Sequence, residues 1–187
     1  MTQLPRCIII TGRPGAGKTT LAKRLAQAIH MPMLSRDEIK EGYVQTFGQA
    51  HHELPPETNR IVTHIFFDTA RSMLESGVSI VIEAAFQHKL WAEFVPGIIA
   101  CSRPRIIVCD ADPETCARRH LERGLADSDR ERFHGDHRVA HYRQTGEMLP
   151  PGPWQAPGFD VPTLKIDTSS SIEISLPNVL QFTSDKT

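Results

Sequence analysis

The segment Gly12–Thr19, which reads GRPGAGKT, constrains the fold of this chain more than any other stretch. It matches the pattern G-x-x-x-x-G-K-[ST] at every fixed position. The apolar, β-branched run RCIIIT precedes it and is typical of a strand that is buried on both faces. After Lys18, leucine or isoleucine recurs every four residues, which predicts a helix that ends before Pro32. The sequence therefore predicts a strand, a glycine-rich loop and a helix in direct succession.

This order of elements is the context in which such a loop binds the phosphates of a nucleotide. Its glycines let the backbone turn tightly with the N–H groups pointing inward, and the following helix adds the positive end of its dipole. Lys18 can reach the β- and γ-phosphates, and the hydroxyl of Thr19 can bind Mg²⁺. The predicted nucleotide-binding residues of the loop are Gly12, Arg13, Pro14, Gly15, Ala16, Gly17, Lys18, Thr19 and Thr20.

Strands and helices alternate along the rest of the chain. Short apolar runs predict further strands at 31–35, 78–84, 104–110 and 163–169. Helical periodicity and end signals predict further helices at 36–43, 55–77 and 113–124, with a helical start at 88. The alternation implies an α/β fold in which helices cover both faces of a five-stranded parallel sheet. We expect one domain over residues 1–187, with the charged segment 124–146 as a helical lid.

Polar or small residues fall at the carboxyl ends of the predicted strands: Gly12, Ser35, Glu83, Asp110 and Asp167. Ligands bind at this edge of a parallel sheet, so the pattern predicts a site there without reference to any motif. Glu83 is predicted to help hold Mg²⁺ or to line the acceptor pocket. Asp110 is expected to cap the turn DADPE rather than to act in the site.

Charge and cysteine content restrict the possible partners and the compartment. Lys and Arg number 21 against 22 Asp and Glu, and the net charge of -1 gives no support to broad nucleic-acid binding. The four cysteines include no C-x-x-C pair, so we expect reduced thiols. The first residues lack the basic and apolar segments of a signal peptide, and no apolar run is long enough to span a bilayer. We therefore expect a cytoplasmic protein that makes no membrane contact.

Three stretches, IIITGRPGAGKTTLAKRLA, LSRDEIKE and IIVCDADPETCARRHLERG, resemble the small P-loop kinases of the nucleoside-monophosphate-kinase-like class. The closest resemblance is to the AAA_33 sub-group, which includes polynucleotide 5′-hydroxyl kinases, chloramphenicol phosphotransferase and zeta-toxin-type sugar-nucleotide kinases. It runs from about Arg6 to Thr168. It implies the three-layer α/β/α fold of P-loop NTPases and transfer of a phosphoryl group from ATP.

Asp37 follows the second predicted strand. In the resembling kinases the acidic residue at this place accepts the proton of the substrate hydroxyl, so the resemblance implies that Asp37 is the catalytic base. The alternative is that Asp37 only stabilises the N-terminus of its helix, where acidic residues are favourable. At the same helix end, Ser35 and Glu38 are expected to form an S-x-x-E capping box. Arg36 is either an anion-binding residue or a solvated one.

Arg119 and Arg123 lie four residues apart on one face of a predicted helix. In the resembling kinases such arginines clamp the nucleotide or stabilise charge on the transferring phosphoryl group. The resemblance therefore implies a catalytic role for Arg123 and a nucleotide contact for Arg119. The alternative is a solvated helix face. Three arginines of the predicted lid are further candidates for phosphate contacts, namely Arg130, Arg132 and Arg138.

Histidine and tryptophan residues admit alternative roles. His134, His137 and His141 are spaced as metal ligands could be, but the lid already explains their segment and we favour it. Trp91 and Trp154 could stack on a base or a sugar, although packing is the expected role for both.

Three functions remain after these observations. The first is an ATP- and Mg²⁺-dependent kinase that phosphorylates a hydroxyl of a small-molecule or nucleotide-like acceptor, held by residues from 37–60 and 84–95. The second is a 5′-hydroxyl polynucleotide kinase, in which nucleic acid is contacted only at its end. The third, from another class, is an ATPase or switch module with no phosphoryl acceptor. It would share the phosphate loop but would need no Asp37.

Overall fold

The computed structural model describes residues 3–169 and 172–184. All strand pairs in it are parallel and form a five-stranded sheet in the order β2-β3-β1-β4-β5. The strands are β1 Arg6–Gly12, β2 Met33–Ser35, β3 Ile80–Glu83, β4 Arg103–Asp110 and β5 Thr163–Asp167. The predicted sheet is therefore confirmed, and the strand that leads into the phosphate loop lies at its centre.

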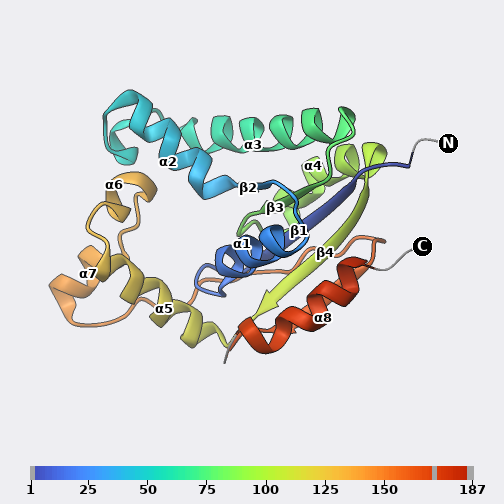
Figure 1. Ribbon diagram of the computed structural model, residues 1–187. Helices are drawn as coiled ribbons and strands as arrows, with labels where there is room; N and C mark the ends of the chain where they lie inside the picture. The colour runs from blue at the N-terminus through green and yellow to red at the C-terminus, as the bar shows by residue number, and fades with distance from the viewer. Residues whose placement is uncertain (1–2, 170–171, 185–187) are drawn as a thin grey trace.

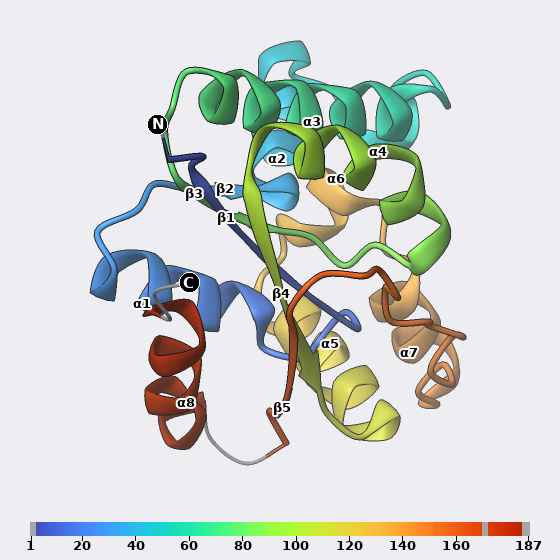
Figure 2. The same cartoon turned by 90° about the vertical axis from the view of Figure 1, so that its right-hand side faces the viewer.

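Helices cover both faces of the sheet, with α1 and α8 on one face and α3 and α4 on the other (Figures 1 and 2). This arrangement confirms the predicted three-layer α/β/α fold. The helical elements are α1 Lys18–Ala28, α2 Arg36–Phe47, η1 His51–Glu53, α3 Thr58–Glu75, α4 His88–Cys101, α5 Pro113–Ala126, α6 Arg130–His134, α7 Arg138–Thr145 and α8 Ile172–Ser184. Helix α8 occupies a segment for which the sequence pattern predicts no element.

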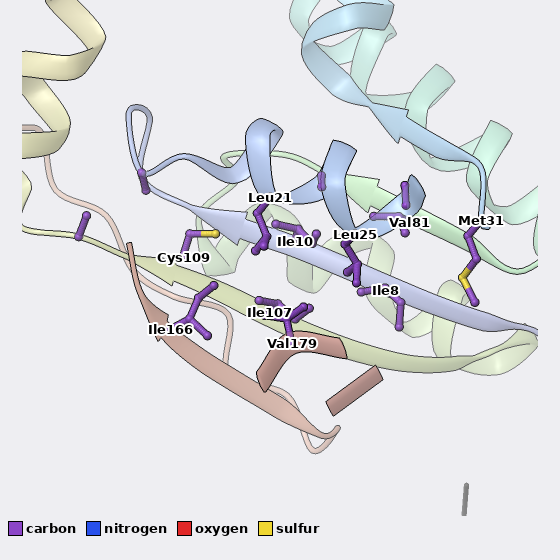
Figure 3. Packing of buried hydrophobic residues seen from close by; sticks show 14 of the residues in the cluster. Ile8, Ile10, Leu21, Leu25, Met31, Val81, Ile107, Cys109, Ile166 and Val179 are labelled. Carbon is purple, nitrogen blue, oxygen red and sulfur yellow. The ribbon is translucent and has the colours of Figure 1, made fainter. Parts of the chain in front are cut away.

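The core has two halves, one on each face of the sheet. On the α1 and α8 side, alternate residues of the central strands, such as Ile8, Ile10 and Ile107, pack against Leu21 and Val179 (Figure 3). On the α3 and α4 side, the intervening strand residues pack against aromatic side chains of the helices. Because both faces are covered, the strands read as continuous apolar runs. The core thus holds the carboxyl ends of the strands together at one edge of the sheet.

That edge carries the loops and helices that complete the site. Strands β1, β2 and β3 end at Gly12, Ser35 and Glu83, as the sequence predicts. Helices α6 and α7 lie in the segment 124–146 that the sequence predicts as a lid, and α6 lies beside α2 at this end of the molecule (Figure 1). Within the part of the chain that the structure describes, no helix combines the length and apolar character that crossing a bilayer requires.

Candidate active site

The phosphate loop packs tightly against helix α5, and this packing explains why residue 15 is a glycine. Gly15 has a φ of +88°, which side-chain-bearing residues rarely adopt. A Cβ atom at this position would also collide with the backbone carbonyl oxygen of Cys116 in α5. Inside the loop, the Lys18 ammonium donates a hydrogen bond of 2.9 Å to the carbonyl oxygen of Arg13. The loop is therefore a pre-shaped backbone turn with a buried cation at its base.

Glu83 joins the end of β3 to the phosphate loop. Its Oε2 atom accepts hydrogen bonds from the Thr19 hydroxyl at 3.2 Å and from the Ser35 hydroxyl at 3.0 Å. The predicted capping box is therefore wrong, because the Ser35 hydroxyl bonds to Glu83 and makes no cap at the start of α2. Glu38 points away and pairs with Lys23 at 2.9 Å. A buried carboxylate attracts the hydroxyl more strongly than an exposed helix end does.

Burial displaces the pKa values of the two charged groups at the base of the site. Burial lowers the pKa of Lys18, although the nearby Glu83 and Asp37 act in the opposite direction. Burial raises the pKa of Glu83, while Lys18 acts in the opposite direction. Each group is thus costly to charge alone and is stabilised by its neighbour. A further charge of either sign at this point would interact strongly with both.

Asp37 and the phosphate-loop residues Pro14, Lys18 and Thr19 line one cavity of about 300 Å³. About half of the Asp37 side chain is exposed, at 51%. Partial burial raises the pKa of Asp37, but His134 and the cations around it outweigh burial and hold that pKa below its usual range. Asp37 is therefore ionised at neutral pH and can accept a hydrogen bond. Besides Asp37, the cavity is lined by Pro14, Lys18, Thr19, Lys40, Glu83, Ala85, His120, Arg123, Arg130, His134 and Asp136.

The predicted arginines separate into two groups. Arg123 and Arg130 line the same cavity as Asp37, as a phosphate-binding role requires. Arg119 does not line it, because its guanidinium donates to the carbonyl oxygens of Thr168 and Ser169 beyond β5. Its predicted nucleotide contact stays a prediction.

Three other arginines lie outside this cavity. Arg132 lies over the ring of Phe133. Arg138 lines a neighbouring cavity. Arg36 is mostly buried and donates to the side-chain oxygen of Asn59 at 2.9 Å, so it is not a solvated residue. It does not line the cavity that contains Asp37.

Residues of α2 and α5 contact the segment that the sequence predicts as a lid. The buried Lys40 donates to the carbonyl oxygen of His134 at 3.1 Å, and the His134 ring lies 3.0 Å from the carboxylate of Glu41. On the other side, His120 of α5 pairs with Asp136 at 2.7 Å. The sequence pattern singled out neither Lys40 nor this pair. The one signal for Lys40 is its place one helical turn after Asp37.

The sequence offers two candidate metal sites, one of histidines in the segment 124–146 and one at Thr19 and Glu83. Among the described residues, no group of three or more His, Cys, Asp or Glu side chains could hold a metal ion, so the histidine site is not formed. The oxygen atoms of Thr19 and Glu83 lie together at the loop and are the hard donors that Mg²⁺ prefers.

The expected cap by Asp110 is wrong, because Asp112 accepts from the Thr115 amide at 2.8 Å, whereas Asp110 pairs with Lys165.

The remaining aromatic and thiol expectations are largely confirmed. Trp91 is fully buried, and its indole N–H donates to the Thr11 hydroxyl at 3.1 Å. Trp154 packs against the core but also lines the cavity next to Arg138. All four cysteines are free thiols.

Comparison with known proteins agrees with this geometry. A family model described as an AAA domain, AAA_33, matches residues 7–147. No curated protein matches the chain. Among solved structures, a candidate kinase from Chloroflexus aurantiacus J-10-fl is 27% identical, with 97% of each chain covered and a TM-score of 0.75.

Two further solved structures are more distant. The APS kinase CysC of Mycobacterium tuberculosis, in complex with AMPPNP and APS, is 15% identical, with a TM-score of 0.68 over 98% of this chain and 99% of that one. A gluconokinase from Sinorhizobium meliloti 1021 is 14% identical, with a TM-score of 0.56 over 96% and 92% of the two chains. At these identities the likeness shows the fold, which is that of P-loop kinases.

Proposed function

The chain belongs to the AAA_33 family of AAA domains, and on that basis we propose that it is an ATP- and Mg²⁺-dependent phosphotransferase acting on a hydroxyl group. One observation carries the proposal. A single cavity contains the phosphate-loop residues Lys18 and Thr19 and, facing them, the ionised carboxylate of Asp37. Transfer to an alcohol needs both sets of groups, because the loop holds the phosphates and a base orients the attacking hydroxyl.

The donor side of the cavity would hold the triphosphate. The loop amides and the N-terminus of α1 favour the phosphates, and Lys18 supplies a positive charge that burial keeps from solvent. Thr19 and Glu83 would hold Mg²⁺, which neutralises charge on the β- and γ-phosphates when bound. Arg123 lines the same cavity and would stabilise the charge of the transferring phosphoryl group.

The acceptor side would hold the alcohol. As the hydroxyl oxygen attacks the γ-phosphorus, its proton must move to a base within hydrogen-bond reach. Asp37 is an ionised carboxylate that lines the cavity and is half exposed, whereas Asp136 of the same lining is paired with His120. The lid, held to α2 by the Lys40–His134 contact, would keep water away from the transferring group.

A product assay tests this function. The protein is incubated with Mg²⁺ and γ-labelled ATP in the presence of sugars, nucleosides, antibiotics and an oligonucleotide with a 5′-hydroxyl end. We expect label to move from ATP onto one class of these compounds. Transfer to the oligonucleotide alone would select the 5′-hydroxyl kinase alternative. Release of label only as inorganic phosphate, at a rate that no compound changes, would instead support the switch and contradict the kinase.

A further inference from the structure

A second cavity, of about 240 Å³, adjoins the catalytic cavity on the side of the proline-rich segment 150–162. The two cavities share three lining residues, Pro14, Ala85 and His120. The second cavity therefore opens toward the point where the phosphate loop meets the end of β3. A molecule that occupies it can extend one end into the catalytic cavity.

The polar groups of this second cavity are mainly hydrogen-bond donors. The indole N–H of Trp154 is buried and finds no hydrogen-bond acceptor among the described residues. The Arg138 guanidinium lines the cavity and makes only long contacts, 3.5 Å to the carbonyl oxygen of Leu149 and 3.9 Å to the carboxylate of Asp136. An unmade indole hydrogen bond is costly when buried, so the site favours a ligand that accepts one.

The charged side chains that line the second cavity are arginines. Arg13 and Arg138 contribute two positive charges, and none of the described residues that line the cavity is Asp or Glu. Arg13 also donates to the carbonyl oxygen of Gly152 at 2.6 Å and so joins the proline-rich segment to the phosphate loop. Much of the remaining wall is apolar, including Pro113, Ala117 and Pro153. A guanidinium and an unpaired indole donor that line one largely apolar cavity are suited to a carboxylate or a phosphate.

From this juxtaposition we propose that the second cavity binds the anionic group of the phosphoryl acceptor, which is a hydroxyl compound carrying a carboxylate or a phosphate. The proposal rests on the phosphotransferase function. Arg138 and the Trp154 indole bind the anion, and the hydroxyl extends past Pro14 and Ala85 toward Asp37. In the transfer, the hydroxyl oxygen bonds to the γ-phosphorus while the bond from that phosphorus to the β–γ bridging oxygen breaks. ADP leaves and Asp37 takes the proton.

The indole signals of the two tryptophans provide a direct binding assay. The protein, saturated with Mg²⁺ and AMPPNP to fill the donor site, is titrated with two matched pairs of probes while the ¹H–¹⁵N indole resonances are followed. The pairs are D-gluconate with D-glucose, and glycerol 3-phosphate with glycerol. We expect an anionic member of a pair to shift the Trp154 resonance and its neutral partner to leave it in place. Trp91, fully buried and bonded to Thr11, is the internal control.

Substitutions identify the groups that bind the probe. Arg138→Gln is expected to raise the apparent Kd of the shifting probe about tenfold or more, because it removes a charge-assisted hydrogen bond. Arg132→Gln is the matched control, since Arg132 lies over Phe133 and lines neither cavity. The carboxylate and phosphate arms tell which anion the cavity takes. Equal shifts with neutral and anionic probes, or no Trp154 shift with either anion, would overturn the proposal.

A kinetic readout separates this inference from the function on which it rests. Where the labelled product forms, Arg138→Gln should raise the KM of the acceptor and leave the KM of ATP unchanged. A rise in the KM of ATP alone would assign Arg138 to the nucleotide and contradict the acceptor site. If no compound is phosphorylated but the Trp154 resonance still shifts with an anion, the cavity binds anions and the phosphotransferase function fails.

Discussion

At the scale of single residues, Glu83 and Asp37 lie in the same cavity but have pKa values displaced in opposite directions. Burial dominates at Glu83 and raises its pKa, whereas surrounding positive groups outweigh burial at Asp37 and lower its pKa. Two carboxylates with different environments can take different roles. In the proposed function, Glu83 would bind a cation beside Thr19, and Asp37 would accept the proton of the acceptor hydroxyl.

Replacing Glu83 with Gln should weaken the response to Mg²⁺. The amide oxygen can still accept from Ser35 and Thr19, but the negative charge is lost. We expect the Mg²⁺ concentration for half-maximal transfer to rise about tenfold or more. It is measured by titrating Mg²⁺ in the transfer assay. The control is Asp110→Asn, because Asp110 also ends a strand but pairs with Lys165 outside the cavity. An unchanged Mg²⁺ response in Glu83→Gln would remove Glu83 from the metal site.

Lys40 should make stability depend on pH. Burial lowers its pKa to about 8 in the folded protein, from 10.5. Between these values the unfolded chain binds more protons, so the free energy of unfolding rises with pH from about 8 to 10.5 and is lowest below about 8, where both states are protonated. We expect this rise, roughly 3 kcal/mol, to disappear in Lys40→Met. Urea unfolding of both proteins at pH 7 and pH 10.5 measures it. Equal pH dependence in the two would contradict the buried charge.

Site residues that carry a positional signature can be predicted from the sequence, whereas those without one cannot. Lys18 and Thr19 belong to a fixed motif, and Glu83 is marked by its place at a strand end. Lys40 and Asp136 carry no such mark, because their roles depend on where the lid meets α2 and α5. The Ser35 cap was wrong for a related reason, since a buried carboxylate distant in sequence competes with the local helix end for the hydroxyl.

At the scale of elements, the phosphate loop depends on its fit against α5. Gly15→Ala should destabilise the loop, because the new Cβ meets the backbone of Cys116 and the φ of +88° is unfavourable for alanine. We expect loss of nucleotide binding, measured by calorimetric titration with Mg-ATP. Retention of wild-type affinity would show that the loop can move away from α5.

Gly42 offers the opposite case within a helix. It lies inside α2, is exposed, and has no atom within 4 Å of the position that a Cβ would take. Gly42→Ala should therefore stabilise the protein by about 0.5–1 kcal/mol, because alanine loses less backbone entropy in a helix. Chemical denaturation measures the change, and nucleotide binding should be unaffected. A loss of stability would mean that α2 needs flexibility at this position.

The His120–Asp136 pair should hold the lid to α5. The hydrogen bond from His120 helps to lower the pKa of Asp136 to about 2, although partial burial acts in the opposite direction. Ionised Asp136 therefore stabilises the fold above about pH 4, and its contribution is lost as the pH falls toward 2. Asp136→Asn should cost about 1–2 kcal/mol at neutral pH. It should also raise amide hydrogen exchange in residues 130–145. Unchanged exchange there would show that other contacts hold the lid.

Most elements could be predicted because their signals are local. Each strand is a short apolar run, and the ends predicted at Glu83, Asp110 and Gly12 agree with the structure. Helix α8 was not predicted, because Pro177 lies inside it and proline is unfavourable in a helix interior. Its packing on α1 and β5 outweighs that local preference.

At the scale of the whole molecule, the site exists only because the fold joins segments far apart in sequence. The catalytic cavity takes residues from the phosphate loop, from α2, from the end of β3, from α5 and from the lid. The sequence predicted several of these groups, because parallel strands bring their carboxyl ends to one edge. It could not predict the second cavity, because the path of the proline-rich segment past Arg13 and Trp154 has no periodic signal.

The central claim is that Asp37 receives the proton of an acceptor hydroxyl across from the phosphate loop. The most direct measurement compares Asp37→Asn with Glu38→Gln, its neighbour on α2, whose carboxylate pairs with Lys23 outside the cavity. Phosphoryl transfer to the acceptor and affinity for Mg-ATP are measured on both. We predict that Asp37→Asn lowers the transfer rate about 100-fold or more and keeps its nucleotide affinity, while Glu38→Gln retains both. Transfer by Asp37→Asn at the rate of the unmodified protein would contradict the claim.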